Sequence, residues 1–423
     1  MALAAHKTEG AALLLARYPA PNGAAWLNRA RNDAAARLAD MGAPFGRDEY
    51  WRYTPPAALL GDVADVAHVA DEALFNAADA HELVFVDGVF DAAQSTILDD
   101  VALQIQTLDA ADADIHWAAD LYGALESAGQ NPVPRPMAAL NTARAGQGVL
   151  VRVMGAAKPV VLRHIRKSAN ADAMLHHVIK VEAKAKLTLL EDGVVATRAN
   201  TVIEVDVADT ATFDHIRNQG RDHGRLLTTH IFARLGAESR FKSFTLSLNG
   251  RLSRNEAVIT LTGDNASAHI AGAAVGDGDF LHDDTIFITH DAEHCESRQV
   301  FKKVLRNGAN GVFQGKILVK QGAQKTDGYQ ISQGLLLDDD SNFLAKPELE
   351  IYADDVICSH GSTCGSVDET SLFYLTSRGV PRAEAQDLLV LAFLDEAIAE
   401  IRDDVVADML RNRLGGWLER HRG

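Results

Sequence analysis

Sulfur and imidazole side chains are the strongest candidates for chemistry in this sequence. Cys358 and His360 lie in the run Cys358–Cys364, which reads CSHGSTC. In an extended strand, residues two apart point to the same face, so this segment would present a thiol and an imidazole side by side. A soft thiolate together with an imidazole suits iron, zinc and iron–sulfur clusters. Two ligands do not complete a closed site, so a cluster here needs ligands from elsewhere in the chain or from another chain.

Composition alone leaves a second interpretation of these residues open. A free cysteine in a β-rich protein is more often a small buried hydrophobic residue than a ligand, so Cys358 is either a ligand or a support for its strand. His294 and Cys295 are adjacent, and their side chains diverge in an extended segment. We expect the histidines from His164 to His294 to be hydrogen-bonded or exposed polar residues rather than ligands.

Paired carboxylates are the other candidates. We expect them to lie in solvated turns rather than to form a catalytic pair; they are Asp283–Asp284, Asp338–Asp340 and Asp354–Asp355. The sequence contains no P-loop, no Gly-x-Ser-x-Gly elbow and no His-Glu-x-x-His motif. Gly272 and Gly276–Gly278 lie in a stretch without helices, which does not suit a dinucleotide-binding loop. The chain therefore shows no nucleotide site of its own.

Composition and charge argue against several classes of protein. Of the 423 residues, 47% are apolar and 23% are charged, so the chain can bury a sizeable core. The 41 basic and 58 acidic residues give a net charge of −17, which argues against nucleic acid or an anionic membrane as the main partner. No apolar run approaches the roughly 18 residues of a membrane span, and no secretory signal is visible. Three cysteines without a Cys-x-x-Cys pair indicate a soluble protein of a reducing compartment, the cytoplasm.

The hydrophobic pattern divides the chain into three zones. Residues 1–80 are rich in alanine and read as helical, with Trp26 to Leu38 on one face of a helix that Gly42 ends. The aromatic block Asp48–Pro55 predicts a packing anchor between this region and the next. Residues 81–365 have the period of two that is typical of strands, clearest from Ile179 to Leu189, and Asp87-Gly88 predicts a hairpin.

This long β zone is compatible with a sandwich, a propeller or a parallel β-helix. An irregular solenoid fits the run of short strands best, because no strict repeat and no room for crossover helices is visible. Residues 366–423 return to a helical period. Asp368 predicts an N-cap and Pro381 the first turn of a longer helix, which is apolar on more than one face. Such a helix packs on two sides, against its own domain or a partner subunit.

Several of these segments together resemble the SufB/SufD family of iron–sulfur cluster assembly proteins. The most specific stretch is Lys346–Val356 running into Cys358–Gly361, and this form is the SufD-like one. The other segments that carry the resemblance are Glu49–Thr54, Ser297–Lys302, Gly311–Gly315, Lys325–Gly328, Leu372–Leu375 and Ser377–Gly379.

The resemblance implies a mainly β protein with a right-handed parallel β-helix core flanked by N- and C-terminal α-helical regions, in agreement with the three zones. It also implies a non-catalytic scaffold subunit of a SufBCD complex that supports iron–sulfur cluster assembly and iron acquisition. In such a complex a SufC-type ATPase docks on the C-terminal helical domain. The docking residues expected on these helices are Leu372, Phe373, Leu388, Leu391, Phe393 and Leu394.

By the same resemblance, a SufB-like subunit pairs with the end of the β-helix, and a transient iron–sulfur cluster forms at that interface. His360 would face a cysteine of the SufB-like subunit, with Cys358 close by, so this chain alone holds no cluster. A homodimer is expected as an alternative assembly of the isolated chain. Cys295 and Cys364 receive no role from the resemblance, and neither flavin binding, the iron donor nor the stoichiometry follows from it.

Two other functions compete with this one. A carbohydrate-active lyase or hydrolase on a β-helix would need converging carboxylates in a groove of the solenoid, whereas the acidic pairs here are scattered along the sequence. A storage or self-associating solenoid would need no chemistry at all.

Overall fold

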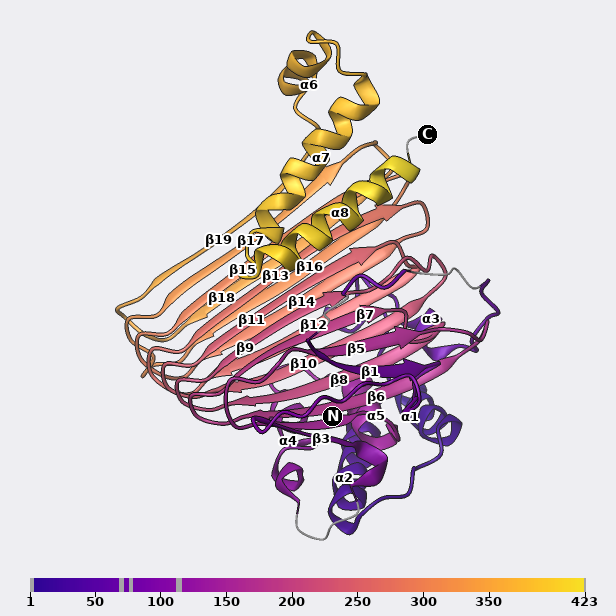
Figure 1. Cartoon of the computed structure of the whole chain (residues 1–423), viewed down its shortest axis with the longest axis vertical. Coiled ribbons are helices and arrows are strands. Elements are labelled where there is room, and N and C mark those ends of the chain that lie inside the picture. Colours follow the sequence, from indigo (N-terminus) through magenta and orange to yellow (C-terminus); the bar gives the residue numbers. More distant parts are fainter. Residues whose placement is uncertain (1–3, 68–71, 76–78, 112–115, 422–423) are drawn as a thin grey trace.

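A computed structural model describes residues 4–67, 72–75, 79–111 and 116–421 of the chain. Its central part is a parallel β-helix, in which successive strands alternate between two facing sheets (Figure 1). Sheet A consists of β1 (His81–Val86), β2 (Val89–Phe90), β5 (Val160–Ile165), β7 (Lys186–Gly193), β9 (Thr212–Asn218), β11 (Arg240–Leu248), β13 (Ser267–Asp277), β15 (Glu296–Arg306), β17 (Asp327–Leu336) and β19 (Ile357–Gly365). Sheet B consists of β3 (Leu103–Thr107), β4 (Val149–Val153), β6 (Asp172–Val181), β8 (Arg198–Val207), β10 (Leu226–Leu235), β12 (Leu252–Leu261), β14 (Leu281–His290), β16 (Asn310–Val319) and β18 (Asn342–Ile351).

Helices accompany the β-helix at both ends of the chain. The N-terminal ones are α1 (Ala5–Arg17), α2 (Ala25–Met41) and α3 (Ala57–Leu60), and between β3 and β4 lie α4 (Ala124–Ala128) and α5 (Pro136–Arg144). Short 3₁₀ turns are η1 (Glu49–Trp51), η2 (Leu108–Ala110) and η3 (Trp117–Asp120). The C-terminal helices are α6 (Glu369–Thr376), α7 (Arg382–Ile398) and α8 (Asp404–Arg420). The predicted fold class, a mainly β parallel solenoid with flanking helices, is thus confirmed.

Two apolar layers hold these parts together. The first lies between the sheets, where alternate residues such as Leu189 and Phe213 of sheet A face Ile203 and Ile231 of sheet B. The second lies on the outer face of sheet A, where α7 and α8 cover it (Figure 1). None of the helices in the described part of the chain is long and apolar enough to cross a membrane.

Local signals in the sequence match the structure at several points. The Asp87-Gly88 turn joins β1 and β2 as an antiparallel hairpin, and Gly42 ends α2 with a positive φ of 74°. Asp368 caps α6 by accepting hydrogen bonds from the backbone N–H groups of Thr370 and Ser371. The helix N-cap and the hairpin predicted from residue types are therefore confirmed.

One predicted strand is two strands. The alternation from Ile179 to Leu189 spans the end of β6 in sheet B and the start of β7 in sheet A. The corner between them contains Lys184, whose φ is +67°. The alternation continues through the corner because odd-numbered residues face the interior in both strands, so the pattern carries no mark of the change of sheet.

The aromatic block near residue 50 anchors the N-terminal region to the outer face of sheet B, as predicted. Trp51 is buried, and the Arg254 guanidinium lies 4.2 Å from its ring centroid. The Thr54 hydroxyl donates a hydrogen bond of 2.5 Å to Asp283, which also forms a buried ion pair with Arg254. Figure 1 shows the N-terminal helices gathered at the end of the β-helix opposite to β18 and β19.

The expectation that Asp283 and Asp284 form a solvated turn is wrong. Both lie in β14 and are buried, with Asp283 paired to Arg254 and Asp284 to Lys303 at 2.6 Å. Arg254 lies on β12, the neighbour of β14 in sheet B, whereas Lys303 lies on β15 in the facing sheet A. Only the coiling of the chain brings these charges together. The sequence pattern does not show that both carboxylates are buried in ion pairs, because their partners are distant in the sequence.

Replacing Arg254 with leucine is expected to destabilise the protein strongly. The substitution leaves Asp283 buried without its charged partner, a change that lowers the free energy of unfolding by about 3–5 kcal/mol. Chemical denaturation of the purified chain measures this loss. The matched control is Arg234→Leu, which breaks a half-exposed pair with Asp206 and should lower stability by at most about 1 kcal/mol. Equal losses in the two variants would contradict the importance of the buried pair.

Candidate functional site

The two sheets end at β18 and β19, and this end of the β-helix is open. No strand follows either of them among the described residues, and neither strand contains a buried residue. Apolar side chains such as Leu344, Ile351 and Ile357 are exposed there, the last by 74%. An uncovered final strand also presents unpaired backbone N–H and C=O groups, which makes it a template for pairing with another chain.

Register places the candidate ligands on one face of β19. Cys358, His360, Ser362 and Cys364 lie opposite Gly328, Gln330, Ser332 and Gly334 of β17, residues that face the interior. The hydroxyl groups of Ser332 and Ser362 are 2.7 Å apart, in agreement with this shared orientation. We call this row of four side chains the β19 inner row. The extended conformation that the sequence predicts for Cys358 and His360 is therefore present.

The two predicted ligands differ in their surroundings. Cys358 is half-buried and packs against Ile317 and Ala353, and burial raises the pKa of its thiol above the ordinary value. His360 is exposed, and within the described residues it makes no hydrogen bond, ion pair or ring contact. Cys358 thus supports its strand and borders the open end, while its role as a ligand stays a prediction.

The inner row is an incomplete set of ligands. Cys364 is exposed, like His360, but it lies four residues further along the strand, a distance of about 13 Å at 3.3 Å per residue. No group of three or more His, Cys, Asp or Glu side chains in the part of the chain that the structure describes is arranged to hold a metal ion. The thiol and imidazole donors suit iron and iron–sulfur clusters, but a cluster bound here would need additional ligands from outside this row.

Cys295 and His294 are part of the scaffold. Cys295 is buried, and its Sγ lies 3.3 Å from the carbonyl oxygen of Gly263. Burial raises the pKa of the Cys295 thiol, which makes it a poor nucleophile. His294 occupies a corner with a φ of +56°. These two residues therefore have structural positions away from the open end.

The six residues expected to dock an ATPase fall into three groups. Leu372 and Leu394 are buried in the chain's own core, with 2% and 0% exposure, so in this conformation they support the helices from inside. Leu391 and Phe393 are partly buried against the same core. Phe373 and Leu388 are exposed by 72% and 45% and are the members available to a partner.

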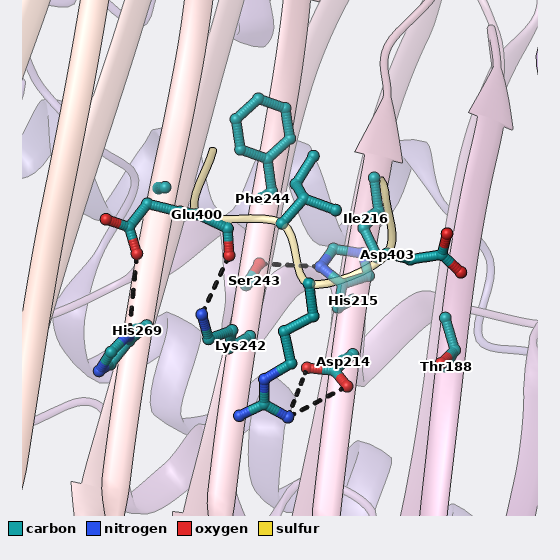
Figure 2. Close-up of a pocket in the computed structure, with 13 residues that line it drawn as sticks. Thr188, Asp214, His215, Ile216, Lys242, Ser243, Phe244, His269, Glu400 and Asp403 are labelled. Atoms are coloured by element: carbon teal, nitrogen blue, oxygen red, sulfur yellow. Dashed lines mark hydrogen bonds and ion pairs between the residues drawn. The ribbon is translucent and has the colours of Figure 1, made fainter. Parts of the chain in front are cut away.

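The turn between α7 and α8 is fastened to the outer face of sheet A by polar contacts, as Figure 2 shows. Arg402 pairs with Asp214 at 3.4 Å, Lys242 donates a hydrogen bond of 3.0 Å to the carbonyl oxygen of Glu400, and the Glu400 carboxylate faces His269. Burial lowers the pKa of Lys242 and raises that of Asp214. The cavity beside these residues has a volume of about 40 Å³, which is room for a few waters.

Sequence reasoning missed this attachment. Asp214, Lys242 and His269 lie on β9, β11 and β13, one coil apart from each other, so no local motif connects them. The only signal for them is the recurrence of a polar residue at the coil spacing, which becomes visible once the strand register is known.

The acidic pairs do not form the groove that a carbohydrate-active enzyme needs. Asp283 and Asp284 are held in buried ion pairs, and Asp355 pairs with Lys325 at a corner of the solenoid. Asp338 accepts hydrogen bonds from the backbone N–H groups of residues 340 and 341 in its own turn. The carboxylates are thus engaged separately rather than directed at a common point.

Comparisons with known proteins show the family to which the chain is related. A family model described as "SUF system FeS cluster assembly, SufBD core domain" matches residues 164–393. The chain is 28% identical over 401 residues to the iron–sulfur cluster assembly protein SufD of Escherichia coli (strain K12), covering 90% of each chain. It is 29% identical over 402 residues to an iron–sulfur cluster assembly SufBD family protein of Synechocystis, covering 88% of this chain and 86% of that protein. With SufD of Bacillus subtilis it shares 28% identity over 252 residues, 57% of each chain.

The fold and these matches define a β-helix protein of iron–sulfur cluster assembly. Because the family model covers more than half of the chain, the chain belongs to the SufBD core family of the SUF system. The resemblance to SufD found in the sequence is confirmed by the two SufD proteins among these relatives.

The three cysteines are expected to react with a thiol-alkylating reagent at different rates. The thiolate is the reactive form, so burial and the raised pKa should make Cys358 react roughly tenfold more slowly than the exposed Cys364, and Cys295 more slowly still. Raising the pH should increase the Cys358 rate, because its thiolate fraction grows. Mass spectrometry of peptides from partly alkylated protein measures each rate. Equal rates at Cys358 and Cys364 would show that Cys358 is not shielded.

Proposed function

We propose that this chain is a non-catalytic, SufD-like scaffold subunit of a cytoplasmic SufBCD complex, where it supports iron–sulfur cluster assembly and iron acquisition. One observation carries the proposal: the open end of the β-helix presents His360 and Cys358 on one inner row, next to a strand edge that is available for pairing. Donors suited to iron and a surface suited to a partner therefore meet at one place. A role in iron–sulfur cluster assembly agrees with the family.

The partner at the open end is a SufB-like subunit in this proposal. Its end strands would extend sheets A and B beyond β18 and β19 and cover Leu344, Ile351 and Ile357. It would also supply the ligands that the inner row lacks, so that a transient cluster is held only between the two chains. In the absence of that subunit, the same edge would pair with a second copy of this chain and form a homodimer.

The ATPase of the complex, a SufC-like partner, would dock on α6 and the first half of α7. Phe373, Tyr374 and Leu388 are exposed apolar side chains of these helices, and Figure 1 shows α6 projecting beyond the β-helix. Exposed aromatic and aliphatic side chains of this kind are typical anchors of protein interfaces. The absence of a P-loop from the sequence supports the assignment of ATP hydrolysis to the partner.

Replacing His360 with alanine should lower cluster formation by the complex reconstituted with SufB-like and SufC-like subunits. Loss of a ligand that no neighbouring side chain replaces is expected to reduce the yield roughly tenfold or more, measured by visible absorbance and by iron and sulfide content. Ser359→Ala, which alters the opposite face of the same strand, is the control and should leave the yield unchanged. A normal yield from His360→Ala in an intact complex would remove His360 from the mechanism.

Polar substitutions on the projecting helices should weaken ATPase binding. Phe373→Ser and Leu388→Ser each remove an exposed apolar anchor, and we expect the dissociation constant for the SufC-like subunit to rise roughly tenfold or more. Titration calorimetry with the full-length chain measures it. Val405 is similarly exposed on α8, away from the proposed surface, so Val405→Ser is the control for loss of apolar area. Unchanged affinity in both test variants would place the ATPase elsewhere.

A further inference from the structure

Directly beneath His360, two glutamines continue its column into the interior of the β-helix. Gln330 of β17 is the register partner of His360, and Gln299 of β15 is the register partner of Gln330. Neighbouring strands of a sheet lie about 4.8 Å apart, so side chains of one column on the same face are within reach of each other. The three residues therefore form a continuous polar column that ends at the open end.

The side-chain amides of the two glutamines are buried without hydrogen-bond partners. Both have 0% exposure, and neither amide oxygen nor amide nitrogen of either side chain has a hydrogen-bond partner among the described residues. Leaving a buried polar group unpaired lowers the stability of a protein, so a pair of amides without any hydrogen bond requires an explanation. A leucine or methionine would fill the same space without this loss.

The facing sheet makes room for the amide of Gln330. Gly315 lies in β16, and a Cβ atom at this position would come within 2.4 Å of the Gln330 Oε1 atom. Gly315 has no positive φ that would require glycine, so its role is to leave space. The amide is therefore accommodated by a hollow in sheet B, one strand below the open end.

An apolar residue interrupts the polar column below Gln299. Below Gln299 the register partner is Ile270, an apolar residue of the interior. In the next polar pair further down, Nδ1 of His215 and the hydroxyl of Ser243 are hydrogen-bonded to each other at 2.9 Å. Ile270 thus separates the unpaired amides from the polar groups deeper in the column. On the side of the open end, His360 is the polar residue next to Gln330 in the column.

We propose that Gln330, supported by Gln299, is a positioning residue for His360, an inference that rests on the proposed role of His360 as a ligand. In this proposal the side chains rotate from the arrangement in the structure, where none of these groups is paired among the described residues. The side-chain carbonyl of Gln330 then accepts a hydrogen bond from one ring N–H of His360, and its amide NH₂ donates to the side-chain carbonyl of Gln299. This selects one tautomer of the neutral imidazole and leaves the lone pair of the other ring nitrogen directed at the open end. Ligating histidines are regularly held by such a partner at the nitrogen that does not bind the metal.

The ratio of the two His360 tautomers in the isolated full-length chain tests the proposal. Ring ¹⁵N chemical shifts, assigned by comparison with His360→Ala, report this ratio at a pH where the imidazole is neutral. We expect one tautomer to dominate in the unmodified protein and its excess to fall roughly 5- to 10-fold in Gln330→Met, which keeps the length of the side chain but cannot accept the hydrogen bond. Gln330→Glu retains an acceptor and should keep the excess.

Two further variants distinguish the proposed hydrogen bond from general effects of a substitution. Gly315→Ala fills the hollow that holds the Gln330 amide, so it should reduce the tautomer excess without altering the glutamine. Gln333→Met is the matched control, because Gln333 lies on β17 at an odd position away from the column and contacts Thr363; it should change nothing. Circular dichroism verifies that each variant is folded. An unchanged ratio in folded Gln330→Met, or an equal change in Gln333→Met, overturns the proposal.

Failure of this inference and failure of the proposed function give different results. The tautomer ratio is measured without a cluster or partner, whereas the ligand role is measured by cluster yield in the complex. If His360→Ala abolishes cluster formation but Gln330→Met leaves the ratio unchanged, His360 is a ligand held by something other than Gln330. If the tautomer ratio changes in Gln330→Met but cluster yield does not depend on His360, the hydrogen bond between His360 and Gln330 exists and the proposed ligand role is wrong.

Discussion

In-register parallel pairing of successive coils is the constraint on which the rest of this structure depends. Each strand pairs with the strand one coil away, so every inward side chain stacks on a residue of the coil before it and is covered by a residue of the coil after it. Within the solenoid this leaves ordered side chains without access to solvent. At β19 the lower neighbour is present, and no strand among the described residues pairs with its other edge. The last coil therefore combines an ordered row of donors with access for a partner, and His360 lies in that row.

The same stacking explains the charges inside and on the faces of the β-helix. Arg217 and Glu191 are register partners in the interior, and although burial opposes its ionisation, Arg217 and His215 hold the pKa of Glu191 well below the usual value. Lys303 lies beside both Asp284 and His282, and burial lowers the pKa of that histidine, so it stays neutral next to the lysine. A slip of the register would separate such pairs and leave buried charges uncompensated, which costs several kcal/mol. The ion pairs thus favour one alignment of the coils, the alignment that places Gln330 under His360.

The sequence predicts the parts of this structure that depend on local chemistry. The hairpin at Asp87-Gly88, the cap at Asp368 and the shared face of Cys358 and His360 follow from residue types and a period of two. The corners of the coils do not follow, because their left-handed positions carry ordinary residues: Lys184, Thr210, Glu238, Asn265, His294 and Lys325. Each of these corners is stabilised by a hydrogen bond from its backbone N–H to a carbonyl oxygen of the next coil, as from Glu238 to Asp264. A long-range contact replaces the glycine that a local signal would require, so neither the corners nor the coil repeat is visible in the sequence. The apolar pattern of the helix likewise does not separate the buried Leu394 from the exposed Leu388, because burial depends on the long-range packing of α7.

The attachment of α7 determines how a movement of the projecting helices can reach the open end. Lys302 on the outer face of β15 contacts Glu396 and lies 4.5 Å from the ring of Phe393, so the second half of α7 is fixed to the strand that also carries Gln299 on its inner face. Arg402 and Lys242 fix the following turn to β9 and β11. An internal strand of a parallel sheet cannot shift without breaking the ladders on both sides, so a force on this part of α7 moves the sheet as a body rather than distorting one coil. α6 and the start of α7 project beyond the β-helix (Figure 1). In the proposed complex, a partner bound there would act through a lever whose fixed end lies on β15. Such a lever would change the position of the whole open end relative to a neighbouring subunit rather than the local geometry of His360.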